Sequence, residues 1–504
     1  MFQWDKLQTY REGNRLEAKR AQGGLPHSLW ATYSAFANTQ GGVILLGVEE
    51  LPDKSFRAVG LPDTEKLVTE FWNAINNPQK VSVNLLSDKH LRIMEVDGNQ
   101  ILAIDIPRAE RVDKPVYINN DMLAGAYRRN GEGDYHCTKE SVRAMFRDAA
   151  EKTQDMIVLE NMDLSVFDRE SLRRYRQLMK INRPRHVWEF IDDEDFLHKL
   201  GAVARGEDGH LHPTGAGLLM FGFEYEIVRE YPYYFLDYQE HLDASTRWTD
   251  RIISSSGEWS GNIFDFYFRV YNRLVQDVRT PFKLENGRDR VDDTPVHKAL
   301  REILANCLIN ADYYGPRGLV IIKSFGKLEV ANPGCFRIDI REAVSGGASD
   351  PRNATLMKMF NLVNIGERAG SGIPNIYAVW QQQGWPEPIL TERFSPERTV
   401  LSLEFEDKKS VVTDIMTDMT DILPDMTDKL SDAEQDFLKL LLQHYQDHEW
   451  IDNTTAQTFC DKSPATIKRY LAKLVEVGVL ESAGANKGRR YYLIHTSRTE
   501  GTTK

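Results

Sequence analysis

The sequence lacks long hydrophobic runs. Nowhere in the chain do roughly 20 apolar residues follow one another, the length that a membrane-spanning helix needs. Residues 1–6 show no apolar core behind a basic end, so the start does not look like a secretory signal. We therefore expect a cytoplasmic protein.

Cysteine is scarce, and positive charge is in deficit. The four cysteines, at positions 137, 307, 335 and 460, form no CxxC pair, which argues against a disulfide framework and a zinc site. The formal net charge of −12 excludes a protein that coats nucleic acid over its whole surface, because neutralising phosphates takes a local excess of Lys and Arg. Any contact with nucleic acid must come from basic patches.

What the chain has is enough apolar material for several cores. Its 504 residues, 41% of them hydrophobic, predict roughly three or four domains. We expect an α+β multidomain protein divided into residues 1–150, 151–406, 407–430 and 431–504. In the first division the pattern predicts a helix over 25–39 and strands over 43–48, 91–95 and 101–106. A glycine-rich turn at 130–133 and a further helix near Thr138 follow.

The second division is mixed and ends at an abrupt change of composition. It predicts strands over 218–221 and 233–238, with residues 212–217 as a turn entering the first strand, and a long helix over 296–310. Between 412 and 429 a Thr-Asp pair recurs, which marks a linker. Apolar residues there have the spacing of a coiled-coil seam, although Pro424 should interrupt a continuous helix. The segment is therefore interpreted as either a flexible tether or a self-association segment.

The last division predicts a winged helix. Helices are expected over 431–446 and 454–459, and a third begins at Pro464 behind a capping residue and runs to about 477. A hairpin over 480–494 completes the fold, whose second motif helix enters the major groove of DNA. A basic island in this acidic chain supplies the expected DNA contacts, Thr466, Lys468, Arg469, Lys473, Lys487, Arg489 and Arg490. A winged helix used only for protein contacts or dimerisation is the alternative.

Three separated blocks near the N-terminus carry a family resemblance. They are EGNRLEAK at 12–19, SAFANTQGG at 34–42 and a strand ending GVEE at 47–50, with Lys114-Pro115 and Tyr127-Arg128-Arg129 as later support. Residues 10–150 thus resemble the Schlafen AlbA-like domain. Nuclease members of that family use three carboxylates, which the resemblance places on Glu12, Glu17 and either Glu49 or Glu50, where an aspartate is usual. Many bacterial relatives are nucleic-acid-binding regulators instead.

The residues themselves permit the same chemistry. In a strand Glu17 and Lys19 share one face, while Leu16 and Ala18 face the core. Together with Glu12 and Glu49 or Glu50, such carboxylates form a hard-oxygen site for Mg²⁺ or Mn²⁺, which activates water. The simpler interpretation is a surface ion pair between Glu17 and Lys19. Arg128 and Arg129 are interpreted as either a solvated edge or a contact to nucleic-acid phosphates.

A second resemblance lies between 290 and 400. REILANCLINADY at 301–313 resembles the first ATP-site box of the GHKL superfamily in its RecG-like version, EVANPG at 329–334 the adenine box, and ERAGSGI at 367–373 the glycine-rich lid. Glu302 and Asn306 share a helix face. The resemblance implies an α/β sandwich in which Glu302 activates water and Asn306 holds Mg²⁺. The expected ATP contacts are Glu302, Asn306, Asn310, Asn332, Gly334, Gly370 and Gly372.

One departure from that family bears on activity. Asn332 stands where an aspartate usually accepts from adenine, and a neutral amide forms a weaker hydrogen bond. We therefore expect ATP binding more than hydrolysis, with a degenerate module that only scaffolds dimerisation as the alternative. No Walker motif is present, which argues against a helicase motor.

Three functions remain in view. The preferred one is a DNA-binding transcriptional regulator with a nucleotide-binding switch, acting as a homo-oligomer. The second is a Schlafen-type, metal-dependent nuclease for RNA or single strands in anti-phage defence. The third is an oligomeric scaffold.

Overall fold

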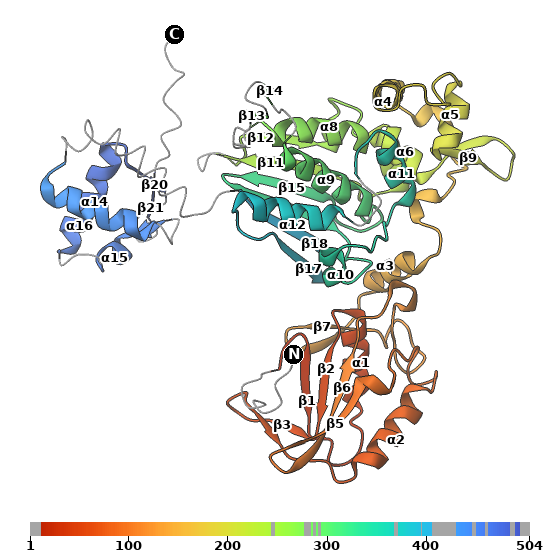
Figure 1. Cartoon of the computed structure of the whole chain (residues 1–504), viewed down its shortest axis with the longest axis vertical. Coiled ribbons are helices and arrows are strands. Elements are labelled where there is room, and N and C mark those ends of the chain that lie inside the picture. Colours follow the sequence, from red (N-terminus) through yellow and green to blue (C-terminus); the bar gives the residue numbers. More distant parts are fainter. Residues whose placement is uncertain are drawn as a thin grey trace. The chain divides into compact units, whose positions relative to one another are not determined.

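The structure is a computed structural model that describes residues 12–242, 247–276, 284–285, 289–290, 294–366, 371–394, 396–405, 430–445, 450–458, 462–483 and 489–493. The chain divides into two compact units (Figure 1). The larger comprises Met1–Gln382 and Glu387–Leu403, and the smaller comprises Gln383–Pro386 and Glu404–Lys504. Apart from Leu430, the predicted linker lies outside the described residues. None of the described helices combines the length and apolar character needed to cross a bilayer.

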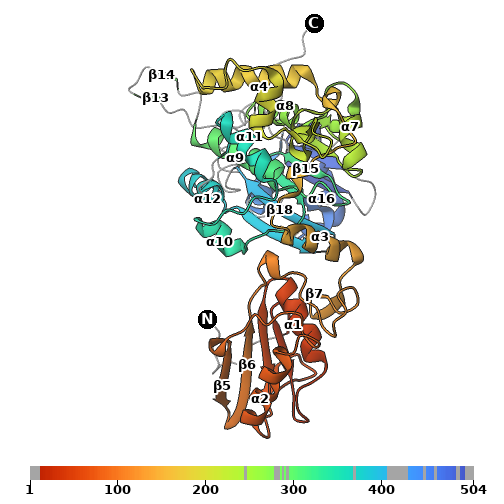
Figure 2. The same ribbon diagram turned by 90° about the vertical axis from the view of Figure 1, so that its right-hand side faces the viewer.

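A four-stranded sheet, in the order β1-β2-β6-β5, forms the first part of the larger unit. Its strands are β1 (Leu16–Lys19), β2 (Gly42–Leu46), β6 (Asn99–Ile106) and β5 (Leu91–Val96). Strand β1 is parallel to β2, and the other neighbours are antiparallel. Helices α1 (Ser28–Asn38) and α2 (Thr64–Ile75) pack on one face of the sheet (Figure 2).

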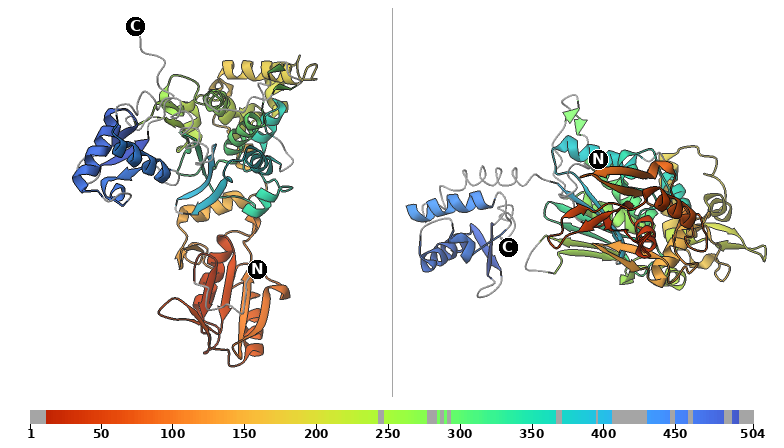
Figure 3. Two further views of the ribbon diagram at one scale, coloured as in Figure 1. Left: turned by 60° about the vertical axis from the view of Figure 1, so that its left-hand side comes forward. Right: turned by 90° about the horizontal axis from the view of Figure 1, so that it is seen from below.

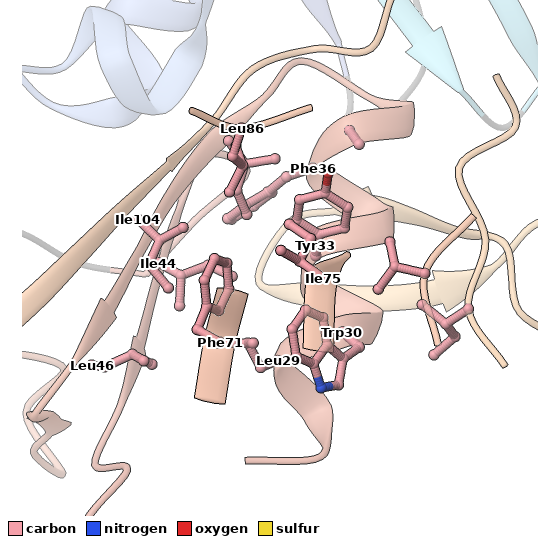
Figure 4. Close-up of a cluster of buried hydrophobic side chains, with 14 of the residues drawn as sticks. Leu29, Trp30, Tyr33, Phe36, Ile44, Leu46, Phe71, Ile75, Leu86 and Ile104 are labelled. Carbon is pink, nitrogen blue, oxygen red and sulfur yellow. The ribbon is translucent and has the colours of Figure 1, made fainter. Parts of the chain in front are cut away.

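The core between these helices and the sheet is aromatic. Trp30 and Phe36 of α1 and Phe71 of α2 face Ile44 of β2 and Ile104 of β6 (Figure 4). The rings of Trp30 and Phe71 stack with centroids 5.5 Å apart. Burying each such side chain contributes about 1.5–3 kcal/mol, so this layer fixes the sheet that carries β1.

Gly47 ends the strand that the sequence predicts over 43–48. Its φ of +84° lies in the left-handed region that glycine favours. The chain continues as β3 (Val48–Glu50), which pairs with β4 (Phe56–Ala58) in a separate hairpin. The predicted continuous strand is therefore wrong beyond Gly47. After β7 (Tyr127–Asn130), the predicted turn and β8 (Gly133–His136), helix α3 (Lys139–Ala149) leads onward.

A six-stranded mixed sheet, in the order β12-β11-β15-β16-β18-β17, organises the remainder of the larger unit. The strands are β12 (Asp250–Ile253), β11 (Leu236–His241), β15 (Leu319–Ser324), β16 (Lys327–Pro333), β18 (Glu397–Glu404) and β17 (Ile389–Phe394). Strand β11 is parallel to β15. Helices α8 (Ile263–Leu274) and α9 (Pro295–Asn310) pack together, and α9 contacts β16.

Shorter elements connect and flank this sheet. The helices are α4 (Arg169–Asn182), α5 (Asp193–Leu200), α6 (Gly215–Phe221), α7 (Glu224–Glu230), α10 (Ile340–Ser345), α11 (Ala354–Leu362) and α12 (Gly372–Gln383). Two small hairpins are formed by β9 (Val203–Arg205) with β10 (Leu211–Pro213), and by β13 (Leu284–Glu285) with β14 (Asp289–Arg290). The 3₁₀ turns are Asp88–His90, Arg111–Asp113, Gln154–Met156, Leu164–Val166 and Ser254–Ser256.

Residues 218–221, predicted as a strand, are helical. Thr214 caps α6 by accepting a hydrogen bond from the Gly217 backbone N at 3.1 Å. Every residue of α6 is buried, so the run shows no polar face. Periodicity does not separate such a helix from a buried strand, which explains the error. The strand predicted over 233–238 exists but begins at Leu236.

The described residues of the smaller unit form three helices and a three-stranded sheet, β19-β21-β20. In chain order its elements are α14 (Asp432–His444), β19 (Ile451–Asp452), α15 (Asn453–Ala456), α16 (Pro464–Glu476), β20 (Leu480–Ala483) and β21 (Arg490–Leu493), shown in blue in Figure 3. Phe437, Leu441, Ile467 and Leu471 belong to its core. The predicted wing loop, 484–488, lies outside the described residues, and the winged helix stays a prediction.

Candidate functional sites

A cavity of about 150 Å³ lies in the central module, defined here as the described residues 294–404. Five of the residues expected to hold ATP line it: Glu302, Asn306, Asn310, Asn332 and Gly372. They come from α9, β16 and the start of α12, far apart in sequence. The fold therefore brings the three sequence boxes to one place.

Helix α9 presents Glu302, Asn306 and Asn310 on one face because they are spaced by four residues. Pro295 occupies the first turn, and Thr294 accepts from the His297 backbone N, so the helix begins at a defined point. Asn306 Nδ2 donates to Glu302 Oε1 at 3.1 Å. This bond holds the carboxylate and the amide together.

Two glycines allow close packing at the cavity. A Cβ on Gly372 would overlap with Glu302 Oε1 and lie 2.8 Å from Asn306 Nδ2. Gly334 has a φ of +92°, and a Cβ there would lie 2.8 Å from Arg352 Nη1, although Gly334 is not itself part of the lining. Gly370, predicted as part of the lid, lies outside the described residues.

Asn332 gives the cavity an unsatisfied acceptor. The residue is 8% exposed, and its Oδ1 has no hydrogen-bond partner in the part of the chain that the structure describes. A buried acceptor left unpaired costs about 1–3 kcal/mol, which a ligand N–H in the cavity would offset. The surrounding wall is largely apolar and includes Ile303, Val330 and Leu401.

The N-terminal carboxylates converge only in part. Glu12 Oε1 accepts from the Ala18 backbone N at 3.0 Å. Burial raises the pKa of the Glu12 carboxyl, and the nearby charges of Glu17 and Glu50 raise it further. Glu49 instead pairs with Arg57 at 2.6 Å and with Arg20 at 3.1 Å. Of the two glutamates left open by the sequence, Glu50 is therefore the one near Glu12.

Glu17 has cationic partners on both oxygens. Its Oε1 lies 2.7 Å from Lys19 Nζ, and its Oε2 lies 2.8 Å from Arg129 Nη2. The side chains of Glu17 and Lys19 are only 12% and 10% exposed, so the pair is more buried than a surface ion pair. Among the described residues, no group of three or more His, Cys, Asp or Glu side chains is arranged to hold a metal ion.

Arg128 and Arg129 do not form an exposed edge. Their side chains are 10% and 1% exposed, and each has an acidic partner inside the protein. Arg128 Nη1 lies 2.7 Å from Glu397 Oε1, and Arg129 Nη1 lies 2.9 Å from Asp134 Oδ1. The interpretation as a solvated edge is wrong, because Glu397 reaches Arg128 and Glu17 reaches Arg129 from distant segments that sequence spacing does not reveal.

The smaller unit presents several of the predicted basic contacts to solvent. Lys468, Arg469, Arg489 and Arg490 are exposed. Thr466 and Lys473 are half-buried, and Lys473 pairs with Glu476 at 3.1 Å. The Arg490 guanidinium lies 4.0 Å from the ring centroid of Trp450. Lys487 lies outside the described residues.

Sequence reasoning missed Arg352 and Asp148. Both oxygens of Asp148 accept from Arg352, from Nε and Nη2, at 2.8 Å each. Arg352 Nη1 also donates to the Asn310 carbonyl oxygen, so α3 is tied to the helix that carries the nucleotide residues. Neither residue belongs to a recognisable box, and their long separation left no local signal.

Three family models match the chain. Residues 12–138 match "Schlafen, AlbA_2", residues 321–400 match "Putative ATP-dependent DNA helicase recG C-terminal", and residues 143–237 match "Domain of unknown function (DUF8451)". No curated protein matches the sequence significantly.

Solved structures give two further similarities. The DIP2311 protein from Corynebacterium diphtheriae is 15% identical over 95% of this chain and 91% of that chain, with a TM-score of 0.39. The N-terminal domain of a putative ATP-dependent DNA helicase RecG-related protein from Nitrosomonas europaea is 32% identical over 27% of this chain and 92% of that chain, with a TM-score of 0.22. Residues 12–138 therefore form a domain of the Schlafen AlbA_2 type, and residues 321–400 form a module of the RecG C-terminal type.

Proposed function

We propose that this chain is a nucleic-acid-binding regulator whose central module binds an adenine nucleotide. The observation that carries the proposal is the unpaired, buried Asn332 Oδ1 in an apolar cavity shared with Glu302 and Asn306. The exocyclic amine of adenine is a donor that would satisfy this acceptor. The two family matches support a function connected with nucleic acids.

The cavity fits the base of a nucleotide in its unpaired acceptor and its apolar wall. When bound, ATP supplies its phosphates and the accompanying Mg²⁺, for which the Asn306 amide oxygen is the expected ligand. Asn332 would select the base, and the absence of a Cβ at Gly372 keeps α12 close to Glu302. Because Asn332 is a neutral acceptor, we propose binding as the role of the module, with hydrolysis secondary.

Nucleotide binding is tested with the full chain and fluorescent ATP and GTP. Asn332→Leu removes the acceptor and should weaken ATP binding at least about tenfold, the equivalent of one buried hydrogen bond. Asn332→Asp should bind ATP at least as tightly as the parent, and Asn73→Leu, at an exposed position on α2, is the control. Equal binding of ATP and GTP, unaffected by Asn332→Leu, would contradict the proposal.

The smaller unit is proposed to bind duplex DNA through its exposed cations. Each phosphate contact contributes about −0.9 to the slope of log affinity against log salt. Arg489→Ala with Arg490→Ala should therefore reduce that slope by roughly 1.8 and weaken binding across sequences. Arg173→Ala with Arg229→Ala, which removes two exposed cations of the larger unit, should leave the slope unchanged. An unchanged slope in the Arg489 and Arg490 variant would favour a protein-contact role for this unit.

A metal-dependent nuclease is the second candidate: the charges of Glu17 and Glu50 raise the pKa of Glu12, although the described residues include no group of three such side chains arranged to hold a metal ion. Labelled RNA, single-stranded DNA and duplex DNA are incubated with Mn²⁺ or a chelator. Cleavage that needs Mn²⁺ and is lost in Glu12→Gln would establish the nuclease. Glu49→Gln is the matched control, because Glu49 pairs with Arg57 and Arg20 instead. Intact substrates held in salt-sensitive complexes would leave the chain a binding protein.

A further inference from the structure

A second, smaller cavity lies between the AlbA_2 domain and the central module, within the larger unit. Its volume is about 30 Å³. The AlbA_2 side contributes Asn38, Arg108, Arg111, Lys114 and Arg128, and α3 contributes Met145 and Asp148. The module contributes Cys335, Phe336, Arg337, Phe394 and Glu397. No family box identified in the sequence accounts for this arrangement.

The cavity carries an excess of positive charge. Its lining and the ion pairs formed by that lining bring together six cations and four carboxylates. The cations are Arg108, Arg111, Lys114, Arg128, Arg337 and Arg352, and the carboxylates are Asp148, Asp350, Glu392 and Glu397. When Lys114 is protonated, two positive charges therefore have no carboxylate partner of their own within this set, and uncompensated buried charge is costly.

Some of the buried donors are also unsatisfied. Arg128 is 8% exposed, and its Nε finds no hydrogen-bond partner among the described residues. The same holds for Arg337 Nε, on a side chain that is 5% exposed. Lys114 Nζ donates to the Asn38 carbonyl oxygen at 3.4 Å, a long bond to a neutral acceptor. Three cationic side chains from both sides of the junction thus have donor capacity left at one small space.

Lys114 shows the electrostatic consequence. Burial, and after it the neighbouring Arg108 guanidinium, lowers the pKa of its ammonium group to about 7. Such a shift means that the charged form lacks stabilisation from its surroundings. An anion in the cavity would supply that stabilisation.

We propose that this cavity binds a small inorganic oxyanion of the phosphate class. Its volume holds about two waters at roughly 10–15 Å³ each, which excludes a nucleotide and an oligonucleotide. A compact oxyanion accepts several hydrogen bonds at once, which matches the spare donors of Arg128, Arg337 and Lys114. The bound anion joins the AlbA_2 domain to the module through charge-assisted hydrogen bonds. The proposal does not rest on nucleotide binding in the larger cavity.

The test is isothermal titration of the full chain with inorganic phosphate at pH 8, at an ionic strength held constant with sodium chloride. Wild type should bind one phosphate, and Lys114→Met should bind it at least about tenfold more weakly, as expected for one lost charge-assisted hydrogen bond. Lys66→Met, which makes the same change at an exposed position on α2, should bind like wild type. The hydrogen-bond partner of Lys114 is the neutral Asn38 carbonyl oxygen, so replacing Lys114 leaves no carboxylate without its ion-pair partner.

A second readout depends on the proton. At pH 8 anion binding should recharge Lys114, so titrations in Tris and in Hepes should differ by the heat of up to about one proton taken up. That difference should vanish in Lys114→Met. Gly372→Ala, whose Cβ would overlap with Glu302 Oε1 in the lining of the larger cavity, should retain phosphate binding and so separates this site from the proposed nucleotide site.

Three outcomes would overturn the proposal. One is the absence of any phosphate binding at millimolar concentration, and another is equal binding by wild type and Lys114→Met. The third is binding that is lost in Gly372→Ala and kept in Lys114→Met, which would place the phosphate in the larger cavity. The double variant Arg128→Met with Glu397→Gln removes a cation together with its acidic partner and provides an independent check, because it too should lose phosphate binding.

Discussion

Lys114 links stability to pH at the scale of a single residue. In the folded chain its pKa is about 7, against the usual 10.5. Between these values the unfolded chain holds a proton that the folded chain lacks, so stability rises with pH from about 7 towards 10.5. Below pH 7 both states are protonated, and the full cost of the buried charge is present.

Lys114→Met should therefore be more stable than wild type in acid. At pH 6 and without phosphate we expect a gain on the order of 2 kcal/mol, reduced by whatever solvent reaches the ammonium group. At pH 9.5 the gain should shrink to less than half. Urea unfolding of the full chain at the two pH values measures it. A gain that is constant with pH would mean that Lys114 is not buried as described.

The sequence predicted residues within one element better than residues that meet across elements. Glu302 and Asn306 could be assigned to one face because four residues separate them on a helix. Arg128 and Arg129 could not be assigned, since Glu397 and Glu17 reach them from other strands. Choosing Glu50 over Glu49 as the neighbour of Glu12 likewise required the turn at Gly47.

At the scale of elements, α6 depends on a close approach to the loop after α5. A Cβ on Gly217 would overlap with the Ala202 carbonyl oxygen. Gly217→Ala should therefore destabilise the larger unit by about 2 kcal/mol or more, because neither backbone segment can move freely. The control is Gly23→Ala, where a Cβ meets nothing within 4 Å. Thermal unfolding compares the two, and a similar small effect of both would contradict the packing described for α6.

Helix α16 depends on its N-cap. The Ser463 side chain accepts from the Thr466 backbone N at 3.3 Å, and Pro464 follows in the first turn. Ser463→Ala should cost the smaller unit about 1 kcal/mol, whereas Ser463→Asp keeps an acceptor and should cost little. The free energies of unfolding of both variants are measured by chemical denaturation, with the signal of Tyr470 on α16 as the probe. Equal losses would show that the cap does not determine where α16 begins.

The helices that the sequence predicted accurately are those whose first residues carry a capping side chain and a proline. Helices α9 and α16 each have a capping side chain and a proline in the first turn, and both were predicted close to their observed start. Helix α6 has a cap but no exposed face, so its apolar run was interpreted as a strand. The two strands β2 and β3 were joined because the left-handed backbone at Gly47 is invisible in the hydrophobic pattern.

At the scale of the whole molecule, Asp148 and Arg352 hold the parts of the larger unit together. Their two hydrogen bonds are each 2.8 Å long, and Arg352 is 7% exposed. Asp148→Asn removes the ion-pair partner of Arg352, which should cost roughly 3 kcal/mol. Calorimetry of wild type should show the larger unit unfolding in one transition, and the variant should show the AlbA_2 domain unfolding earlier. Glu170→Gln, in an exposed pair with Arg173, is the control.

The segment Cys335–Arg337 lines both cavities. Because this segment borders both cavities, a shift that accommodates a ligand in one cavity also changes the shape of the other. If a base in the larger cavity and an anion in the smaller one prefer different positions of this segment, each changes the affinity of the other by the same factor. If both ligands prefer the same position of the segment, they bind cooperatively. If they prefer opposite positions, each weakens the binding of the other although the two ligands are not in contact.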